Sequence, residues 1–241
     1  MDDRISAAVS RIQRDERGAA LLIALMAILL TMALGTALIL GATVESRITR
    51  NFRARTQALY AADAVLEHAV DDLRAIPDWN AALTGIVSSS FIDGPPNGVH
   101  VLADGQRIDQ GAIVNLANCR QSTPCSSAAM DATTIERPWG ANNPRWQPFA
   151  WGHLSGLLPT VESPFYVLAM VADDPSENDA DPLRDGSRSC VPERLDGCNP
   201  GTDRIALRAE AFGPFGAHKI LEATVSRSGP SVHILSWREA R

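Results

Sequence analysis

The 241-residue sequence predicts an α+β protein, in which the outer half of one long N-terminal helix packs against a small antiparallel β-sheet with long loops. Three observations lead to this fold class. Residues 19–44 form an uninterrupted apolar run, and residues 45–76 repeat apolar side chains with a helical period. From Pro77 onward, short apolar runs alternate with dense turn signals.

The apolar run is long enough to cross a membrane. No residue between Arg17 and Glu45 carries a charge, and residues 19–44 correspond to ~39 Å of α-helix at ~1.5 Å per residue. A hydrocarbon core is about 30 Å thick. The run also exceeds the ~7–15 apolar residues of a secretory signal peptide. The sequence therefore predicts a transmembrane helix over residues 19–44.

The helix is expected to continue beyond the membrane. Residues 45–76 contain neither Gly nor Pro, and Pro77 follows directly. Apolar residues recur there at alternating steps of three and four, at Leu59, Ala62, Leu66, Ala69, Leu73 and Ile76. We therefore expect one helix over residues 19–76, apolar on all sides in its first half and amphipathic in its second.

The remainder, residues 77–241, is expected to form a β-rich globular domain. Turn signals are dense, as in Asp93–Gly98 and Asp196-Gly197. The short apolar runs between such signals predict strands at residues 99–102, 112–114, 165–171, 204–210, 219–225 and 232–237. The runs 204–210 and 219–225 flank a Phe-Gly-Pro-Phe-Gly segment, so these two strands should form an antiparallel hairpin.

Four cysteines occur in two local pairs, Cys119 with Cys125 and Cys190 with Cys198. Three connectivities are formally possible, but spacings this short favour the two local bridges. A structural zinc site is disfavoured, because its paired cysteines are separated by about two to four residues, fewer than here. Disulfides persist outside the cytoplasm, so we expect the C-terminal part of the chain there.

Several functional classes are disfavoured by composition. The net charge of −6 argues against nucleic-acid binding, which needs a surplus of Lys and Arg. The five histidines are scattered, and neither an H-x-x-x-H pattern nor a nucleophile elbow occurs. We therefore predict no catalytic residues and do not expect an enzyme.

An acidic stretch from Asp173 to Asp185 has two interpretations. A solvated acidic loop is favoured, whereas a calcium site is the alternative, because carboxylate oxygens are preferred calcium ligands. The spacing does not follow the EF-hand pattern. The calcium candidates are Asp173, Asp174, Glu177, Asp179, Asp181 and Asp185. No other cofactor is expected.

Three tryptophans, Trp139, Trp146 and Trp151, lie in a stretch rich in Pro and Asn. Exposed aromatic side chains in such a stretch would suit the binding of a sugar or a protein. Packing beneath a long loop is the favoured interpretation.

Three sequence blocks between Arg17 and about Leu73 together resemble the PilX family of minor pilins. They are Arg17-Gly18-Ala19-Ala20-Leu21, then Glu45-Ser46-Arg47-Ile48 followed by Asn51-Phe52-Arg53, and finally Ala58-Leu59-Tyr60-Ala61-Ala62-Asp63-Ala64 with Leu66-Glu67. A Gly before an apolar run is weak evidence, but the three blocks in this order and spacing are strong. The resemblance implies a pilin-like fold, with the helix on a small antiparallel sheet and long disulfide-stapled loops.

The resemblance implies that residues 1–18 are a cytoplasmic leader, which prepilin peptidase removes by cutting between Gly18 and Ala19. A Gly suits such a site because it lets a protease approach the backbone closely. The alternative is that Gly18 is an ordinary junction residue beside a membrane anchor that is not cut. Major pilins carry Glu at the fifth mature position, where this sequence has Ile23. The PilX family and the pseudopilin that caps the secretion filament tend to lack this Glu, so a bulk subunit is not expected.

The assembly residues of the helix are Ile23, Gly35, Gly41, Glu45 and Asn51. Small residues in an apolar helix allow close helix approach, although Ala-rich membrane helices are common in general. Gly35 would also loosen the helix locally.

The resemblance implies partners and a location. The expected partners are other minor pilins, the major pilin, the inner-membrane assembly platform, prepilin peptidase and, before assembly, membrane lipid. The expected location is the inner membrane, in a single pass with the C-terminal domain in the periplasm, and then the pilus at the cell surface. Four arginines lie on each side of the apolar run, so charge alone does not set this orientation.

The expected function is that of a minor pilin, which primes or caps a type IV pilus and supports adhesion, twitching motility or DNA uptake. Two alternatives remain at this point. One is a pseudopilin of type II secretion, which shares the leader, the helix and the missing Glu. The other is a single-pass membrane protein that displays a binding module.

Overall fold

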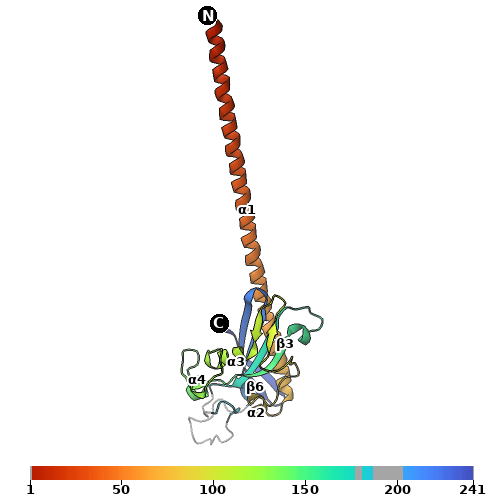
Figure 1. Cartoon of the computed structure of the whole chain (residues 1–241). Helices are drawn as coiled ribbons and strands as arrows, with labels where there is room; N and C mark the ends of the chain where they lie inside the picture. The colour runs from red at the N-terminus through yellow and green to blue at the C-terminus, as the bar shows by residue number, and fades with distance from the viewer. Residues whose placement is uncertain (1, 177–180, 187–202, 241) are drawn as a thin grey trace. The chain divides into compact units, whose positions relative to one another are not determined.

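The computed structural model describes residues 2–176, 181–186 and 203–240, with side chains from residue 18 onward. The chain divides into two compact units, residues 1–51 and residues 52–241. Helix α1 (Asp2–Ala75), the long helix that begins at the red N-terminus in Figure 1, provides the described structure of the first unit and the first element of the second. The helix predicted over residues 19–76 is confirmed to within one residue at its C-terminal end, and α1 also includes the residues predicted to be a leader.

Five strands of the second unit form one antiparallel sheet, in the order β3-β4-β5-β6-β7. Each strand neighbours the next one along the chain. The strands are β3 (Gln147–His153), β4 (Tyr166–Asp173), β5 (Arg204–Gly213), β6 (Ala217–Ser228) and β7 (Ser231–Ala240). The predicted hairpin is confirmed, since β5 and β6 pair antiparallel up to Gly213 opposite Ala217. Strand β3 escaped prediction because it contains Pro148 and Gly152, and it carries an irregularity next to Pro148.

The shorter elements include a small two-stranded sheet and several single-turn helices. They are α2 (Asn80–Leu83), β1 (Val99–Val101), β2 (Arg107–Asp109), α3 (Gln110–Cys119), α4 (Ser127–Asp131), η1 (Gly140–Asn142), α5 (Leu154–Leu157) and η2 (Pro214–Gly216). The strand predicted at residues 112–114 is wrong, because these residues lie in α3. Asp109 caps this helix by accepting a hydrogen bond from the backbone N–H of Ala112 at 3.0 Å.

The inner face of the sheet, which is the face that α1 covers, holds the larger core. Ala62, Leu66, Ala69 and Leu73 of the predicted stripe are buried, while Leu59 and Ile76 are partly buried at the edge of the same cluster. The sheet contributes Val167, Ala169, Leu207, Leu221 and Val225. Because the helix buries one apolar stripe against a sheet, packing rather than helix propensity stabilises this half of α1.

The outer face of the sheet holds a second, smaller core. Alternate residues of β4, namely Tyr166, Leu168 and Met170, point to this face, and all eight residues of β4 are buried. Ile113, Val114 and Ala117 of α3 pack on this core. Strand β4 is therefore covered on both sides, by α1 on the inner face and by α3 with its neighbouring loops on the outer face.

A cation holds the C-terminal end of α1 against the sheet. Pro77 cannot continue the helix, which leaves the last carbonyl groups without intrahelical donors. The guanidinium of Arg227 on β6 donates to the carbonyl oxygens of Leu73 at 3.0 Å, Ile76 at 2.5 Å and Pro77 at 2.8 Å. The same guanidinium lies 4.3 Å from the ring centroid of Trp79, whose Nε1 also donates to Leu73.

Candidate functional site

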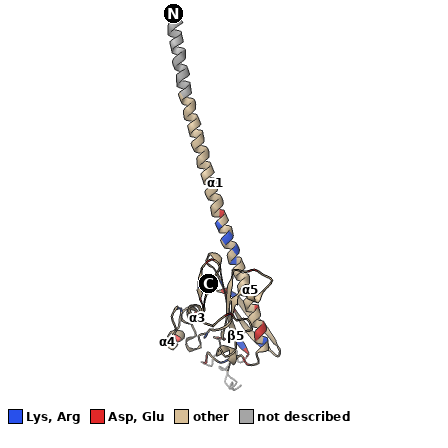
Figure 2. Cartoon of the chain, turned by 45° about the vertical axis from the view of Figure 1, so that its right-hand side comes forward, with Lys and Arg blue, Asp and Glu red and all other residues tan. Residues whose placement is uncertain are grey.

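Residues 18–44 of α1 present apolar side chains on every side of the helix. Leu22, Ile28, Leu34 and Leu40 are each more than half exposed. Within the described residues, α1 is the one helix long and apolar enough to cross a membrane, as judged by length and composition. Figure 2 shows the long stretch of α1 without acidic or basic residues. An apolar surface of this extent requires lipid or another protein to cover it.

The hydroxyl groups in this stretch are satisfied within the helix. Thr31, Thr36 and Thr43 each donate to the backbone carbonyl oxygen three or four residues earlier, at 2.8 Å. In hydrocarbon no water is present to accept these hydrogen bonds. The threonines are therefore compatible with the bilayer.

The assembly residues predicted on this helix do not pack against other parts of the described chain. A Cβ atom added at Gly35 or Gly41 would meet no atom within 4 Å, apart from the helix's own nearby backbone, and the same holds at Gly18 of the predicted cleavage site. The side chain of Ile23 is 68% exposed, and Glu45 and Asn51 are also exposed. Packing within the described part of the chain does not account for the glycines, and their role in close helix approach stays a prediction.

Residues 17–67 match the family model described as PilX N-terminal. The resemblance to the PilX family is thus confirmed over this stretch, the PilX segment, which begins at Arg17 beside the predicted cleavage site. The match makes the chain similar, over these residues, to PilX-type pilins, which are related to the type IV pilus. No curated protein and no solved structure matches the chain.

The last part of the PilX segment is explained by packing inside the second unit. In the block from Ala58 to Ala64, the side chains of Ala58, Ala61 and Ala62 are at most 2% exposed. Small side chains at these positions bring the backbone of α1 close to the inner face of the sheet. Tyr60 of the same block is 68% exposed. The buried alanines of the block, together with Leu59 at the edge of the core, are therefore fixed by the fold of the chain itself.

The predicted bridge between Cys119 and Cys125 is confirmed, with an S–S distance of 2.03 Å and a Cα–Cα distance of 5.9 Å. Cys119 is the last residue of α3, and the bridge closes a short loop that leads into α4. The second predicted pair, Cys190 with Cys198, lies outside the described residues.

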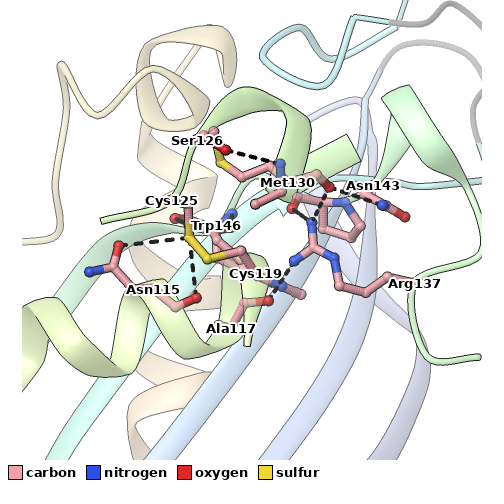
Figure 3. The surroundings of a disulfide bond; sticks show 12 residues. Asn115, Ala117, Cys119, Cys125, Ser126, Met130, Arg137, Asn143 and Trp146 are labelled. Atoms are coloured by element: carbon pink, nitrogen blue, oxygen red, sulfur yellow. Dashed lines mark hydrogen bonds between the residues drawn. A yellow bond between two sulfur atoms is a disulfide. The ribbon is translucent and has the colours of Figure 1, made fainter. Parts of the chain in front are cut away.

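The loops around this bridge are fixed by buried polar side chains (Figure 3). We call residues 110–146 the disulfide module. The guanidinium of Arg137 donates to the carbonyl oxygens of Ala117 at 2.6 Å and of Met130 and Pro144 at 3.1 Å. Asn143 donates through Nδ2 to Met130 and Ala132, both at 3.0 Å. One cation and one amide thus hold α3, α4 and the chain before β3 together.

Within the disulfide module, a reciprocal pair of hydrogen bonds joins α3 to Trp146, the residue directly before β3. Asn118 donates through Nδ2 to the carbonyl oxygen of Trp146 at 3.0 Å, and its Oδ1 accepts from the backbone N–H of Trp146 at 2.7 Å. Both residues are buried. The module therefore lies in a fixed position on the outer face.

Arg137 is a cation in a positive environment. Burial, together with the neighbouring cations Arg145, Arg120 and Arg208, lowers the pKa of Arg137 to about 10, while Asp131 opposes them. No carboxylate lies at ion-pair distance from Arg137 among the described residues. It remains protonated at neutral pH, so its charge is compensated chiefly by carbonyl dipoles.

A groove of about 820 Å³ lies between the disulfide module and the outer face of β5, β6 and β7. Leu116, Arg120, Glu136 and Trp139 of the module form part of its wall. Its floor consists mainly of polar side chains of the sheet: Arg208, Glu222, Thr224, Ser236 and Arg238.

The floor of the groove contains a charged ladder across three strands. Arg208, Glu222 and Arg238 are direct neighbours in the register of β5, β6 and β7. Glu222 accepts from Arg208 Nη1 at 2.7 Å and from Arg238 Nε at 3.0 Å. Behind the ladder, burial alone would raise the pKa of Glu210, but the hydrogen bond from His218 and the charge of Arg208 outweigh burial and lower it. The ladder fixes these side chains in position.

The calcium candidates are largely engaged with the backbone where the structure describes them. Asp174 accepts from the backbone N–H and the hydroxyl of Ser176. Asp185 accepts from the backbone N–H groups of Asp203 at 3.0 Å and Arg204 at 3.1 Å. Burial raises the pKa of Asp185 to about 6 despite these bonds. Asp173 lies at the end of β4, and Asp181 precedes a turn that contains Leu183.

The calcium site itself stays a prediction. Glu177 and Asp179 lie outside the described residues. Among the residues that the structure describes, no group of three His, Cys, Asp or Glu side chains is arranged to hold a metal ion.

The three tryptophans have different environments. Trp146 and Trp151 are buried in the outer core, as the favoured interpretation predicted, whereas Trp139 is 40% exposed on the wall of the groove. Sequence reasoning missed Arg137, Arg227 and the ladder on the groove floor. Nothing in the local sequence marks these residues, because each acts on groups that are distant along the chain.

Proposed function

We propose that this chain is a minor pilin of a type IV pilus, made with a leader over residues 1–18 and used to prime or cap the filament. The observation that carries the proposal is the joint occurrence of the PilX segment and an exposed apolar helix within it. A helix this apolar needs lipid before assembly and other helices afterwards. The proposed partners are accordingly other minor pilins, the major pilin, the assembly platform, prepilin peptidase and membrane lipid.

The proposed location follows from the same helix. Before assembly, the apolar run over residues 19–44 spans the inner membrane once, and the domain from residue 77 onward lies in the periplasm. The bridge between Cys119 and Cys125 supports an oxidising compartment for that domain. After assembly the subunit is carried in the pilus at the cell surface, where it supports adhesion, twitching motility or DNA uptake.

Removal of the leader is the first test. N-terminal sequencing of protein extracted from membranes is expected to begin at Ala19, because the peptidase cuts after Gly18. A protein that retains the leader would contradict the filament assignment and favour a plain membrane anchor that displays a binding module.

The number of copies in the filament is the second test. The charge-assisted contact between a Glu at the fifth mature position and a neighbouring N-terminus contributes roughly 1.5–3 kcal/mol, and Ile23 cannot make it. In a shaft the loss would recur at every subunit, whereas at a tip or in a priming complex it occurs once. Quantitative mass spectrometry of sheared pili should find the chain only in traces. Abundance equal to that of the major pilin would show that the inference from Ile23 is wrong.

The same preparations test the pseudopilin alternative. If deletion of the protein leaves pilus number and twitching unchanged but abolishes secretion of folded exoproteins, the chain serves type II secretion. Loss of pili with intact secretion is the result expected here.

A further inference from the structure

The groove on the outer face has the size and construction of a ligand site. Its volume of about 820 Å³ lies within the ~300–1,000 Å³ that is common for small-molecule sites. Its wall is fixed by the bridge between Cys119 and Cys125 and by Arg137 with its three carbonyl acceptors. A preformed site loses less entropy on binding than a site that must be ordered first.

The main chain of β5 and β6 in the groove floor is not free to bind a peptide. The backbone groups of β5 and β6 are used on both edges in the antiparallel ladders. The floor is also too polar to receive the apolar face of a helix, since Arg208, Glu222 and Arg238 occupy its centre. A ligand that lies over β5 and β6 is therefore held by side chains.

Trp139 provides an aromatic surface on the wall of the groove. The residue is 40% exposed, and its backbone N–H donates to Asn143 Oδ1 at 3.1 Å, which fixes its position. A partly exposed indole ring on a rigid support offers a large apolar face at little entropic cost. The flat apolar face of a sugar ring is complementary to such a surface.

The most exposed charge in the groove belongs to an arginine. The side chain of Arg238 is 73% exposed, whereas its partner Glu222 is 19% exposed and also receives Arg208. On the wall, the side chain of Arg120 is 52% exposed and forms an ion pair at 2.6 Å with Glu136, whose side chain is 59% exposed. A guanidinium binds carboxylates in a planar, bidentate manner. Behind the wall, the charge of Arg137 adds a positive field that lacks a paired carboxylate among the described residues.

We propose that this groove binds an acidic saccharide, in which a sugar ring stacks on Trp139 and the carboxylates of the sugar bind Arg120 and Arg238. This inference goes beyond the role of a filament subunit. It predicts a chemically defined ligand at the surface of the domain, and its test does not depend on pilus assembly.

The test uses the full chain in detergent micelles and isothermal titration calorimetry. The probes are short oligomers of galacturonic, mannuronic and glucuronic acid, together with the methyl esters of the same oligomers, which retain the rings but lose the charge. At least one acidic oligomer is expected to bind, and its ester at least about tenfold more weakly. Affinity for the acidic oligomer should also fall as salt is added.

Matched variants assign the binding to the groove. Trp139→Ala is expected to weaken binding about tenfold. Trp237→Ala removes a tryptophan that is 49% exposed but does not line the groove, so it should change affinity less than about twofold. Arg238→Gln should also weaken binding, while Arg74→Gln, at an exposed site on α1, should not. Circular dichroism checks that each variant is folded.

Three results would overturn the inference. Absence of binding to all three acidic oligomers removes the ligand class. Equal affinity for an acidic oligomer and its ester removes the role of Arg120 and Arg238. Binding that responds equally to Trp139→Ala and Trp237→Ala, or to neither, places the saccharide outside the groove.

Discussion

Replacing Arg227 tests whether the sheet fixes the end of α1. Arg227 is the cation that donates to the carbonyl oxygens of Leu73, Ile76 and Pro77 and lies over the ring of Trp79. Its side chain is only 15% exposed. Hydrogen bonds from a charged donor contribute roughly 1.5–3 kcal/mol each when their acceptors are buried, and the ring contact adds about 1 kcal/mol.

The magnitude is smaller than the sum of these contacts. After Arg227→Ala, water reaches some of the freed carbonyl groups at the helix end, where Pro77 is itself exposed. We therefore expect the free energy of unfolding to fall by about 3–5 kcal/mol, a large part of the ~5–15 kcal/mol typical of a domain. Arg227→Lys keeps the charge but loses the planar guanidinium. This variant should therefore lower the free energy of unfolding by roughly half as much as Arg227→Ala.

The assay is urea unfolding of the full chain in micelles, followed by near-ultraviolet circular dichroism. Arg74→Ala is the matched control, because Arg74 forms an exposed ion pair with Asp71 at 2.5 Å on the same helix. Loss of that surface pair should cost less than about 0.5 kcal/mol. If Arg227→Ala and Arg74→Ala were equally mild, the sheet would not hold the helix end and the reasoning would be refuted.

Three further predictions concern other parts of the second unit. Replacing Cys119 and Cys125 by Ser should lower the free energy of unfolding by about 2 kcal/mol through loop entropy, and reduction of the wild-type protein should reproduce the loss. Because the folded state holds the proton of Asp185 up to about pH 6, whereas the unfolded chain releases it near its usual pKa of 3.8, the folded state binds more protons between these values. The free energy of unfolding of the wild type, relative to that of Asp185→Asn, should therefore fall by up to about 3 kcal/mol as the pH rises from about 4 to 6. A difference between the two proteins that does not change with pH would contradict this prediction. Gly213→Ala would place a Cβ atom 2.1 Å from a buried phenylalanine ring and should cost about 1–3 kcal/mol in thermal or urea unfolding, whereas Gly41→Ala, which meets no atom within 4 Å, should cost nothing.

Features with a local signature could be predicted from the sequence. An uncharged run over residues 19–44 predicts a membrane span, because charged residues are expelled from hydrocarbon. The stripe from Leu59 to Ile76 predicted which side of α1 is buried, since a helix repeats its faces every 3.6 residues. The hairpin of β5 and β6 followed from the turn between them.

Short apolar runs were less informative. Residues 112–114 suit a strand by composition, yet they lie in α3, where the Asp109 cap and the outer core decide the outcome. A run of three residues does not distinguish a period of two from a period of 3.6. Strand β3 is the opposite case, since its composition does not predict a strand. It forms because pairing with β4 overrides the low strand propensity of Pro148 and Gly152.

The groove and the contacts of Arg227 with the end of α1 depend on tertiary structure alone. Arg227 meets the carbonyl of Leu73 across a separation of 154 residues, and Arg208, Glu222 and Arg238 become neighbours only through the register of three strands. The sequence by itself determined the long apolar run, the amphipathic half of the helix and the PilX segment, because each depends on the order and spacing of residues along the chain. The groove could not be predicted in this way, since the energy that fixes its side chains comes from hydrogen bonds and ion pairs between segments that only folding brings together.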